Sequence, residues 1–133
     1  MILTIDIGNT SILFCVFNKS NIFKSYKLSI NKLTKKEDLG KYLKYFYPKK
    51  RIKGIIISSV VPKMNQLFIK FFAENKNVKP YFVDKLISSL DIKTKIKNKK
   101  SIGSDRVVNV IYAKKIYKLP ILVIDFGTAT TID

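Results

Sequence analysis

Three short segments of the chain place an acidic residue beside glycine, and each could take part in phosphoryl transfer. They are Asp6-Ile7-Gly8-Asn9-Thr10, Gly103-Ser104-Asp105-Arg106 and Asp125-Phe126-Gly127-Thr128. Glycine lets backbone N–H groups approach phosphate oxygens, and Asn and hydroxyl side chains add donors. A carboxylate repels phosphate but can hold Mg²⁺, usually through water. The first and third segments therefore predict two facing phosphate turns, with Asp6 and Asp125 as candidate Mg²⁺ ligands.

The middle segment has the composition of a substrate site. Asp105 stands near a predicted helix start, where it could accept the proton of an attacking hydroxyl as a general base. The helix N-terminus and Arg106 could bind an anionic group. Two structural alternatives stay open. Ser104 or Asp105 could merely cap the helix with Arg106 at the surface, or Asp105 and Arg106 could pair with each other.

The hydrophobic pattern predicts an α/β domain that begins with a meander. Antiparallel strands are expected over residues 2–7, 11–17 and 22–30, with Ile12, Phe14 and Val16 on one face of the second. Gly8 and Asn9 suit the first turn because both tolerate positive φ.

Helices and further strands follow the meander. Thr34 and Glu37 have the spacing of a helix capping box. The apolar run 54–60 predicts a strand buried on both faces. Pro62 opens a helix with Leu67, Phe71 and Phe72 facing inward. A strand at 80–83, an irregular basic connection at 85–102 and a helix over 103–117 complete the domain.

The end of the chain repeats its beginning. A strand over 121–125, an Asp-x-Gly-Thr turn and a strand over 130–133 echo the opening hairpin. We interpret residues 1–118 as one domain and residues 119–133 as the start of a second, duplicated one. A hairpin alone is marginal and leaves unpaired strand edges.

Composition limits the class of protein. The net charge is +17, but only Arg51 and Arg106 among the 26 basic residues are arginines, the residue that nucleic-acid readers use most. The lysines are also scattered, so we do not expect a nucleic-acid partner. No apolar run approaches the roughly 20 residues of a membrane span, and the start lacks signal-peptide features. A single cysteine, Cys15, and no histidine fit a cytoplasmic protein without a zinc site.

Four motifs together resemble type III pantothenate kinase, a member of the actin-like kinase superfamily. The matching segments are Asp6-Ile7-Gly8-Asn9-Thr10, Ile57-Ser58-Ser59-Val60-Val61-Pro62, Gly103-Ser104-Asp105-Arg106 with Asn109, and Asp125-Phe126-Gly127-Thr128-Ala129-Thr130-Thr131 with Asp133. Their order and spacing are those of the family. The resemblance covers the whole chain but only about the first half of a family member. Ser104 stands where the family usually has Ala.

The resemblance implies an actin-like, ribonuclease H-like α/β domain with a mixed sheet and flanking helices, followed by the first hairpin of a second such domain. It implies ATP-dependent phosphorylation of pantothenate, the first step toward coenzyme A, by a homodimer. ATP contacts are implied at Asp6, Ile7, Gly8, Asn9, Thr10, Ser11, Ile12, Leu13 and Thr128. Pantothenate contacts are implied at Gly103, Ser104, Asp105 and Arg106, with Asp105 as the catalytic base.

The resemblance also implies a monovalent cation, potassium or ammonium, at Asp125 beside Mg²⁺ with the nucleotide, whereas the residues alone suggest Mg²⁺ there. Three other possibilities remain. The chain could be a non-catalytic nucleotide-binding fragment, an accessory relative linked to transcription, or half of a split enzyme completed by another polypeptide.

Overall fold

The structure, a computed structural model, describes residues 1–46, 52–74, 78–87, 94–98 and 101–133. A five-stranded mixed sheet in the order β3-β2-β1-β4-β5 forms its centre. The expected α/β class is therefore confirmed. Within the described residues no helix is both long and apolar enough to cross a membrane.

The opening meander forms as the alternating pattern predicts. β1 (Ile2–Ile7) pairs antiparallel with β2 (Ser11–Asn18), and β2 pairs antiparallel with β3 (Asn21–Ser29). Ile12, Phe14 and Val16 are all fully buried on one face of β2. The turn between β1 and β2 does not use positive φ, contrary to expectation. The non-glycine residue with positive φ is Lys19, in the tight turn between β2 and β3.

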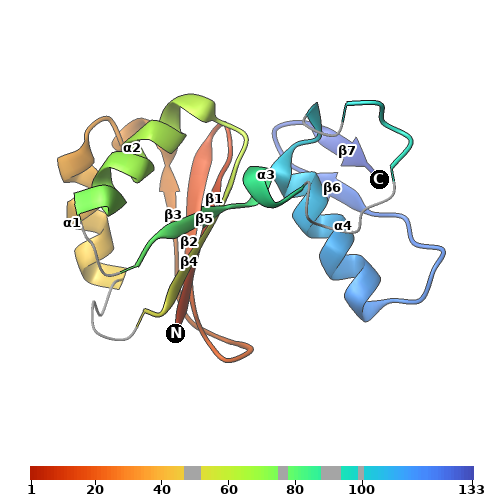
Figure 1. The fold of residues 1–133 in the computed structure, drawn as a ribbon, viewed down its shortest axis with the longest axis horizontal. Helices are drawn as coiled ribbons and strands as arrows, with labels where there is room; N and C mark the ends of the chain where they lie inside the picture. The colour runs from red at the N-terminus through yellow and green to blue at the C-terminus, as the bar shows by residue number, and fades with distance from the viewer. Residues whose placement is uncertain (47–51, 75–77, 88–93, 99–100) are drawn as a thin grey trace.

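Two helices cover one face of the sheet. After the 3₁₀ turn η1 (Ile30–Lys32), α1 (Lys36–Phe46) and α2 (Pro62–Glu74) pack together on the side that buries the apolar residues of β1, β2 and β4 (Gly54–Ser59). Figure 1 shows both helices on this side of the sheet. Inward-facing side chains of α2 are Phe68 and Phe72, whereas the predicted Leu67 and Phe71 are only partly buried.

The start of α1 differs from the predicted capping box. Asp38, not Glu37, accepts hydrogen bonds from the Lys35 N–H and the Thr34 hydroxyl, both at 3.2 Å. The helix begins at Lys36, so Lys35 and not Thr34 directly precedes it. The acid that accepts the backbone N–H of Lys35 is therefore Asp38, three positions later, which is the spacing of a capping box.

The opposite face of the sheet carries the remaining elements. β5 (Pro80–Phe82) leads directly into a short helix, α3 (Val83–Leu86), where the sequence suggested an irregular connection. Residues 88–93 and 99–100 of that connection lie outside the described part. α4 (Ser104–Ile116) follows, and β6 (Ile124–Phe126) pairs with β7 (Thr130–Ile132) as a separate two-stranded sheet. Figure 1 shows α3, α4 and this hairpin together, away from α1 and α2.

Two strand predictions need correction. β4 is not buried on both faces, because Ile55 and Ile57 are fully buried while Ile56 between them is 39% exposed. The strand predicted over 121–125 is observed over Ile124–Phe126. Beyond the strand, Val123 exchanges two 2.9 Å backbone hydrogen bonds with Asp133, so the pairing begins at Val123 and not at Ile121.

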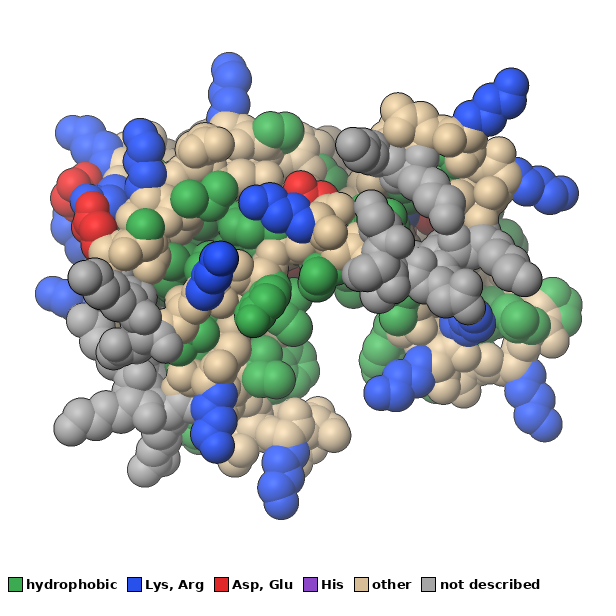
Figure 2. All heavy atoms as spheres, in the orientation of Figure 1, with side chains coloured by type: hydrophobic (Ala, Val, Ile, Leu, Met, Phe, Trp, Pro, Cys, Tyr) green, Lys and Arg blue, Asp and Glu red, His purple; other side chains and the backbone are tan. Residues whose placement is uncertain are grey.

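Surface composition also differs between parts of the molecule. Large apolar side chains of the hairpin and its approach are exposed, including Phe126, Leu119 and Leu122. On the face drawn in Figure 2, Lys and Arg side chains are spread around the outline of the molecule and form no single cluster. This distribution agrees with the expectation that the positive charge is a solvated surface.

The core makes a stability prediction with a matched control. Phe68 is fully buried with its ring centre 6.4 Å from that of Phe14, whereas Phe23 on the edge strand β3 is 60% exposed. We expect Phe68→Ala to lower the free energy of unfolding by about 3–5 kcal/mol, and Phe23→Ala by about 0.5 kcal/mol or less. Urea denaturation measures both. Equal losses would show that the core is wrongly located.

Candidate active site

The site begins where two parallel strands end. β1 and β4 run parallel, and their register places Asp6 opposite Ser58. Parallel strands direct their carboxyl ends to the same edge of a sheet, which is where ligands bind in open α/β sheets. Asp6 and Ser58, each one residue before the end of its strand, therefore lie side by side at this end of the sheet.

Ser104 joins this edge to helix α4. Its side chain is 3% exposed. The Ser104 Oγ accepts the Ser59 N–H at 2.8 Å, donates to the Ser59 carbonyl at 3.0 Å and lies 3.1 Å from the Ser58 Oγ. Neither Ser104 nor Asp105 caps α4: the N-cap residue is Gly103, without a side-chain cap. Ser104 instead holds the first turn of the helix against the end of β4.

Gly103 leaves the room that the next acid needs. A Cβ built at Gly103 would collide with the Asp105 Oδ1 and would lie 3.6 Å from Val60. The Asp105 Oδ1 accepts the Arg106 backbone N–H at 2.8 Å. A side chain at position 103 would therefore displace the Asp105 carboxylate from its place.

The hairpin brings a third acid to the same place. The Asn109 Nδ2 on α4 donates to the Asp125 Oδ2 on β6 at 2.9 Å. One turn earlier on α4, the Arg106 guanidinium binds the Asp133 carboxylate, with its Nε 2.8 Å from Oδ1 and 3.0 Å from Oδ2. These contacts attach the β6–β7 hairpin to α4 and fix the position of Asp125.

The three acids line one cavity of about 360 Å³ between the open face of the sheet and α4. Asp6, Asp105 and Asp125 contribute to its wall from β1, α4 and β6. Ser58 and Asn109 add polar groups, and the rest of the wall is mainly apolar. The apolar lining comprises Ile5, Leu13, Cys15, Phe17, Ile56, Val83 and Val108.

Burial, together with two neighbouring acids, disfavours the ionised form of Asp6. Although the Asp6 side chain keeps contact with solvent, burial raises the pKa of its carboxyl above the ordinary value of 3.8. The charges of Asp105 and Asp125 raise the pKa further, and a hydrogen bond from Ser58 opposes them. This arrangement favours a bound cation, which would relieve the repulsion.

The donor set suits a hard cation. Carboxylate and amide oxygens are the ligands that Mg²⁺ and similar ions take, and Mg²⁺ keeps several waters when few protein ligands are present. No group of three or more His, Cys, Asp or Glu in the described ranges converges closely enough to chelate a metal alone. The residues therefore fit a cation held by one or two carboxylates together with water or substrate phosphate.

The two predicted phosphate turns do face each other. The Thr10 and Thr128 hydroxyls, from the β1–β2 and β6–β7 turns, lie 3.4 Å apart. The Gly8 and Gly127 N–H groups close their own turns on the Ser11 and Ala129 carbonyls, at 3.0 and 3.2 Å. Donors to a ligand must therefore come from the hydroxyls and from other N–H groups.

Not all predicted ATP contacts can act through side chains. Ile7 and Ile12 are fully buried in the core, so only their backbone faces the turn. Asn9 and Thr10 are exposed at its tip, and Leu13 lines the cavity. The buried residues of this segment therefore hold the turn in place, whereas the exposed ones can offer side-chain contacts to a ligand.

Arg106 differs from both sequence alternatives. Its guanidinium pairs with Asp133 and not with Asp105, and it is not simply a surface residue. The hydrogen bond with Asp133 raises the Arg106 pKa. An anionic ligand at Arg106 must therefore share the guanidinium with Asp133.

Sequence reasoning missed several residues of the cavity. Ser58 entered only through the family motif, because its place opposite Asp6 depends on the β1–β4 register. Val83 was assigned to a strand, yet it begins α3 and faces the cavity. Cys15 was considered only as a disulfide or zinc-ligand residue, although it lines the cavity and burial raises the pKa of its thiol. Strand alternation from Leu13 was the signal that could have found it.

Comparison with known proteins gives a consistent result. The profile of the family described as type III pantothenate kinase matches residues 2–133. The chain belongs to the type III pantothenate kinase family. Proteins named type III pantothenate kinase from Listeria welshimeri and Listeria monocytogenes are each 36% identical to it over 140 aligned positions, and one from Listeria innocua is 34% identical. Each alignment covers 98% of this chain and 52% of the relative. The chain thus spans about half the length of these kinases.

The Ser104 junction makes a testable prediction for this family member. Ser104→Ala removes the two hydrogen bonds with Ser59 and leaves the Ser59 N–H without its partner, so we expect a loss of about 1–3 kcal/mol of stability. Ser25→Ala, on the exposed edge strand, is the matched control and should change stability by about 0.5 kcal/mol or less. Thermal or urea unfolding measures both, and an unchanged Ser104→Ala protein would contradict the role of the junction.

The raised pKa of Asp6 makes a pH-dependent prediction. Between the ordinary value of 3.8 and the higher folded value, the folded state binds more protons than the unfolded state, so stability falls as pH rises through this window. Asp6→Asn removes the ionised group, so the variant should be more stable than the unmodified chain at neutral pH. The difference should shrink as pH falls toward about 4.

Asp38→Asn is a control of opposite sign. Burial raises the Asp38 pKa, but hydrogen bonds from Thr34 and Lys35 outweigh it and lower the pKa. Its ionised form therefore supports folding above the ordinary pKa. Asp38→Asn should destabilise the protein at neutral pH and lose its effect in acid. Urea denaturation across the pH range measures both variants, and a less stable Asp6→Asn protein at neutral pH would refute the repulsion account.

Proposed function

We propose that this chain forms the catalytic part of an ATP-dependent kinase that phosphorylates the terminal hydroxyl of pantothenate to 4'-phosphopantothenate. One observation carries the proposal: Asp6, Asp105 and Asp125 come from three separate elements and line one cavity. Membership of the type III pantothenate kinase family supports the choice of substrate. The proposal includes the division into a domain at 1–118 and the start of a second at 119–133.

Asp105 acts as the general base in this proposal. Its Oδ1 is fixed by the Arg106 N–H, which leaves Oδ2 to accept the proton of the pantothenate hydroxyl. The hydroxyl oxygen then bonds to the γ-phosphorus of ATP as the bond from that phosphorus to the β–γ bridging oxygen breaks, and ADP leaves. Gly103, Ser104 and Arg106 position pantothenate, with the carboxylate of the substrate near Arg106.

The facing turns hold the nucleotide. Thr10 and Thr128 donate their hydroxyls to phosphate oxygens, and the backbone from Asp6 to Leu13 forms the wall around them. Mg²⁺, when bound through water at Asp6, would neutralise phosphate charge, and potassium or ammonium at Asp125 would do so beside it. Holding both substrates in line supplies most of the acceleration, because phosphoryl transfer needs mainly positioning and charge stabilisation.

Assembly and location belong to the same proposal. Exposed apolar residues on α4, such as Tyr112 and Ile116, are suited to a homodimer contact. Sedimentation at micromolar concentration tests this, and a monomer throughout would count against it. We also assign the enzyme to the cytoplasm, in keeping with its single cysteine.

The test is ADP release by the 133-residue chain with ATP, pantothenate, Mg²⁺ and potassium. We expect turnover that depends on pantothenate and falls at least about 100-fold in Asp105→Asn. The Mg·ATP affinity of that variant should stay within about threefold, because Asp105 is assigned to the hydroxyl. Asp84→Asn, an exposed acid on α3, is the matched control and should retain full turnover. An Asp105→Asn enzyme within about threefold of the unmodified rate would disprove the base assignment.

A non-catalytic nucleotide-binding protein is the second candidate, because the facing Thr10 and Thr128 hydroxyls suit a bound nucleotide whether or not a reaction follows. Calorimetry with Mg·ATP separates it from the kinase. Binding that Thr128→Val weakens, without any ADP release, would support this alternative. Salt-sensitive DNA binding without turnover would instead support an accessory role in transcription. Turnover that appears only with a co-purified polypeptide would indicate a split enzyme.

A further inference from the structure

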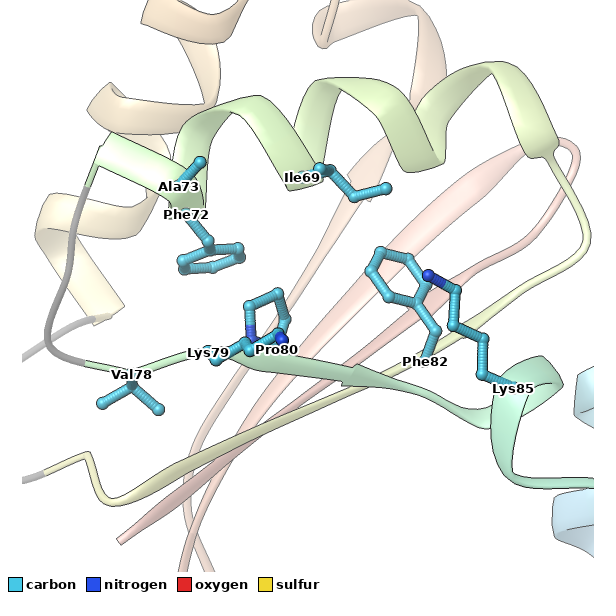
Figure 3. Close-up of a pocket in the computed structure, with 8 residues that line it drawn as sticks. All are labelled: Ile69, Phe72, Ala73, Val78, Lys79, Pro80, Phe82 and Lys85. Atoms are coloured by element: carbon cyan, nitrogen blue, oxygen red, sulfur yellow. The ribbon is translucent and has the colours of Figure 1, made fainter. Parts of the chain in front are cut away.

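A second cavity lies between helix α2 and strand β5, apart from the acidic site. It encloses about 380 Å³, within the range of about 300–1,000 Å³ that small-molecule sites occupy. Its lining residues come from α2, from β5 and the two residues before it, and from α3 (Figure 3): Ile69, Phe72, Ala73, Val78, Lys79, Pro80, Phe82 and Lys85. None of them lines the acidic cavity. We call this cavity the α2–β5 groove.

The floor of the groove is aromatic and largely part of the core. Phe72 is 4% exposed and Phe82 is 6% exposed, and Figure 3 shows their rings in the space between α2 and β5. In the part of the chain that the structure describes, β5 is the edge strand of the sheet and pairs with β4 alone. The groove therefore offers an apolar surface beside the unpaired edge of β5.

The charge at the groove is positive. Lys79 and Lys85 are charged residues of the lining, and no acid stands among the described residues that line the groove. The Lys85 Nζ lies 5.8 Å from the centre of the Phe82 ring, within the range of a cation–π contact. The acid that follows Ala73 on α2, Glu74, points away to Lys36 on α1, at 2.6 Å. The ammonium group of Lys85 thus lies over the Phe82 ring, and none of the described lining residues supplies a carboxylate to neutralise it.

We propose that the α2–β5 groove is a binding site for a small amphipathic monocarboxylate. The alkyl chain of the ligand lies on Ile69, Ala73 and Pro80, whose side chains keep part of their surface exposed, and it removes that apolar surface from water. The carboxylate pairs with the ammonium group of Lys85 at the rim. This site is independent of the kinase chemistry, so the proposal does not depend on turnover.

A series of straight-chain carboxylates from hexanoate to decanoate tests the site with the chain in its intact form. The dissociation constant, measured by calorimetry, should fall about fourfold with each added methylene, which is the fold-change equivalent to burying one methylene. Amide chemical-shift changes on addition of decanoate should centre on residues 69–73 and 78–85. An affinity independent of chain length, or shifts centred on the exposed hairpin around Phe126, would overturn the proposal.

Two variants test separately the contact with the carboxylate of the ligand and the contact with its alkyl chain. Lys85→Gln should weaken decanoate binding about three- to fivefold, the effect of one partly exposed ion pair. Lys70→Gln, which removes an exposed lysine of α2 that does not line the groove, is the matched charge control and should leave the affinity unchanged. Ala73→Leu should reduce binding by filling the groove. If both lysine variants lost the same affinity for decanoate, the attraction would come from the net charge of the protein alone, and the proposal would be wrong.

Discussion

The candidate site depends on how one buried hydroxyl connects two parts of the structure. Ser104 bonds to the N–H and carbonyl of Ser59 and lies beside the Ser58 hydroxyl, so the first turn of α4 is fixed to the end of β4. Because β4 is parallel to β1, the same contact places Asp105 near Asp6. From α4, Asn109 and Arg106 then hold the hairpin that carries Asp125. Each later step in this series relies on α4 being held at its N-terminus.

Electrostatic repulsion within the site lowers the stability of the folded protein. Three carboxylates from separate elements share a cavity whose other walls are largely apolar, and the pKa of Asp6 is raised by burial and by both neighbours. Such a cluster weakens the folded state at neutral pH and gains stability when a cation binds. The same repulsion supports the proposal that a cation binds there together with the nucleotide. Perturbed acids of this kind are common at functional sites.

Much of the fold could be predicted because its local signals agree with its tertiary structure. Alternation in β2 gave the buried face correctly, and paired acid–glycine turns at opposite ends of the chain do meet at Thr10 and Thr128. The prediction failed where long-range pairing decides the outcome. The register of β1 against β4 selects Ser58, and the pairing of Arg106 with Asp133 links residues far apart in sequence. The exposed side of Ile56 could not be foreseen, because an apolar run does not reveal which face the helices cover.

The central claim is that Asp6, Asp105 and Asp125 form one negative cavity that accepts a cation with the nucleotide. Carboxyl carbon NMR titration of the chain, with and without Mg·ATP, tests it most directly. We expect Asp6 in the free protein to titrate above its ordinary value of 3.8, and to move to lower pH when Mg·ATP is added, because a bound cation favours the ionised form. An Asp6 that titrates at its ordinary value and does not respond to Mg·ATP would contradict the claim.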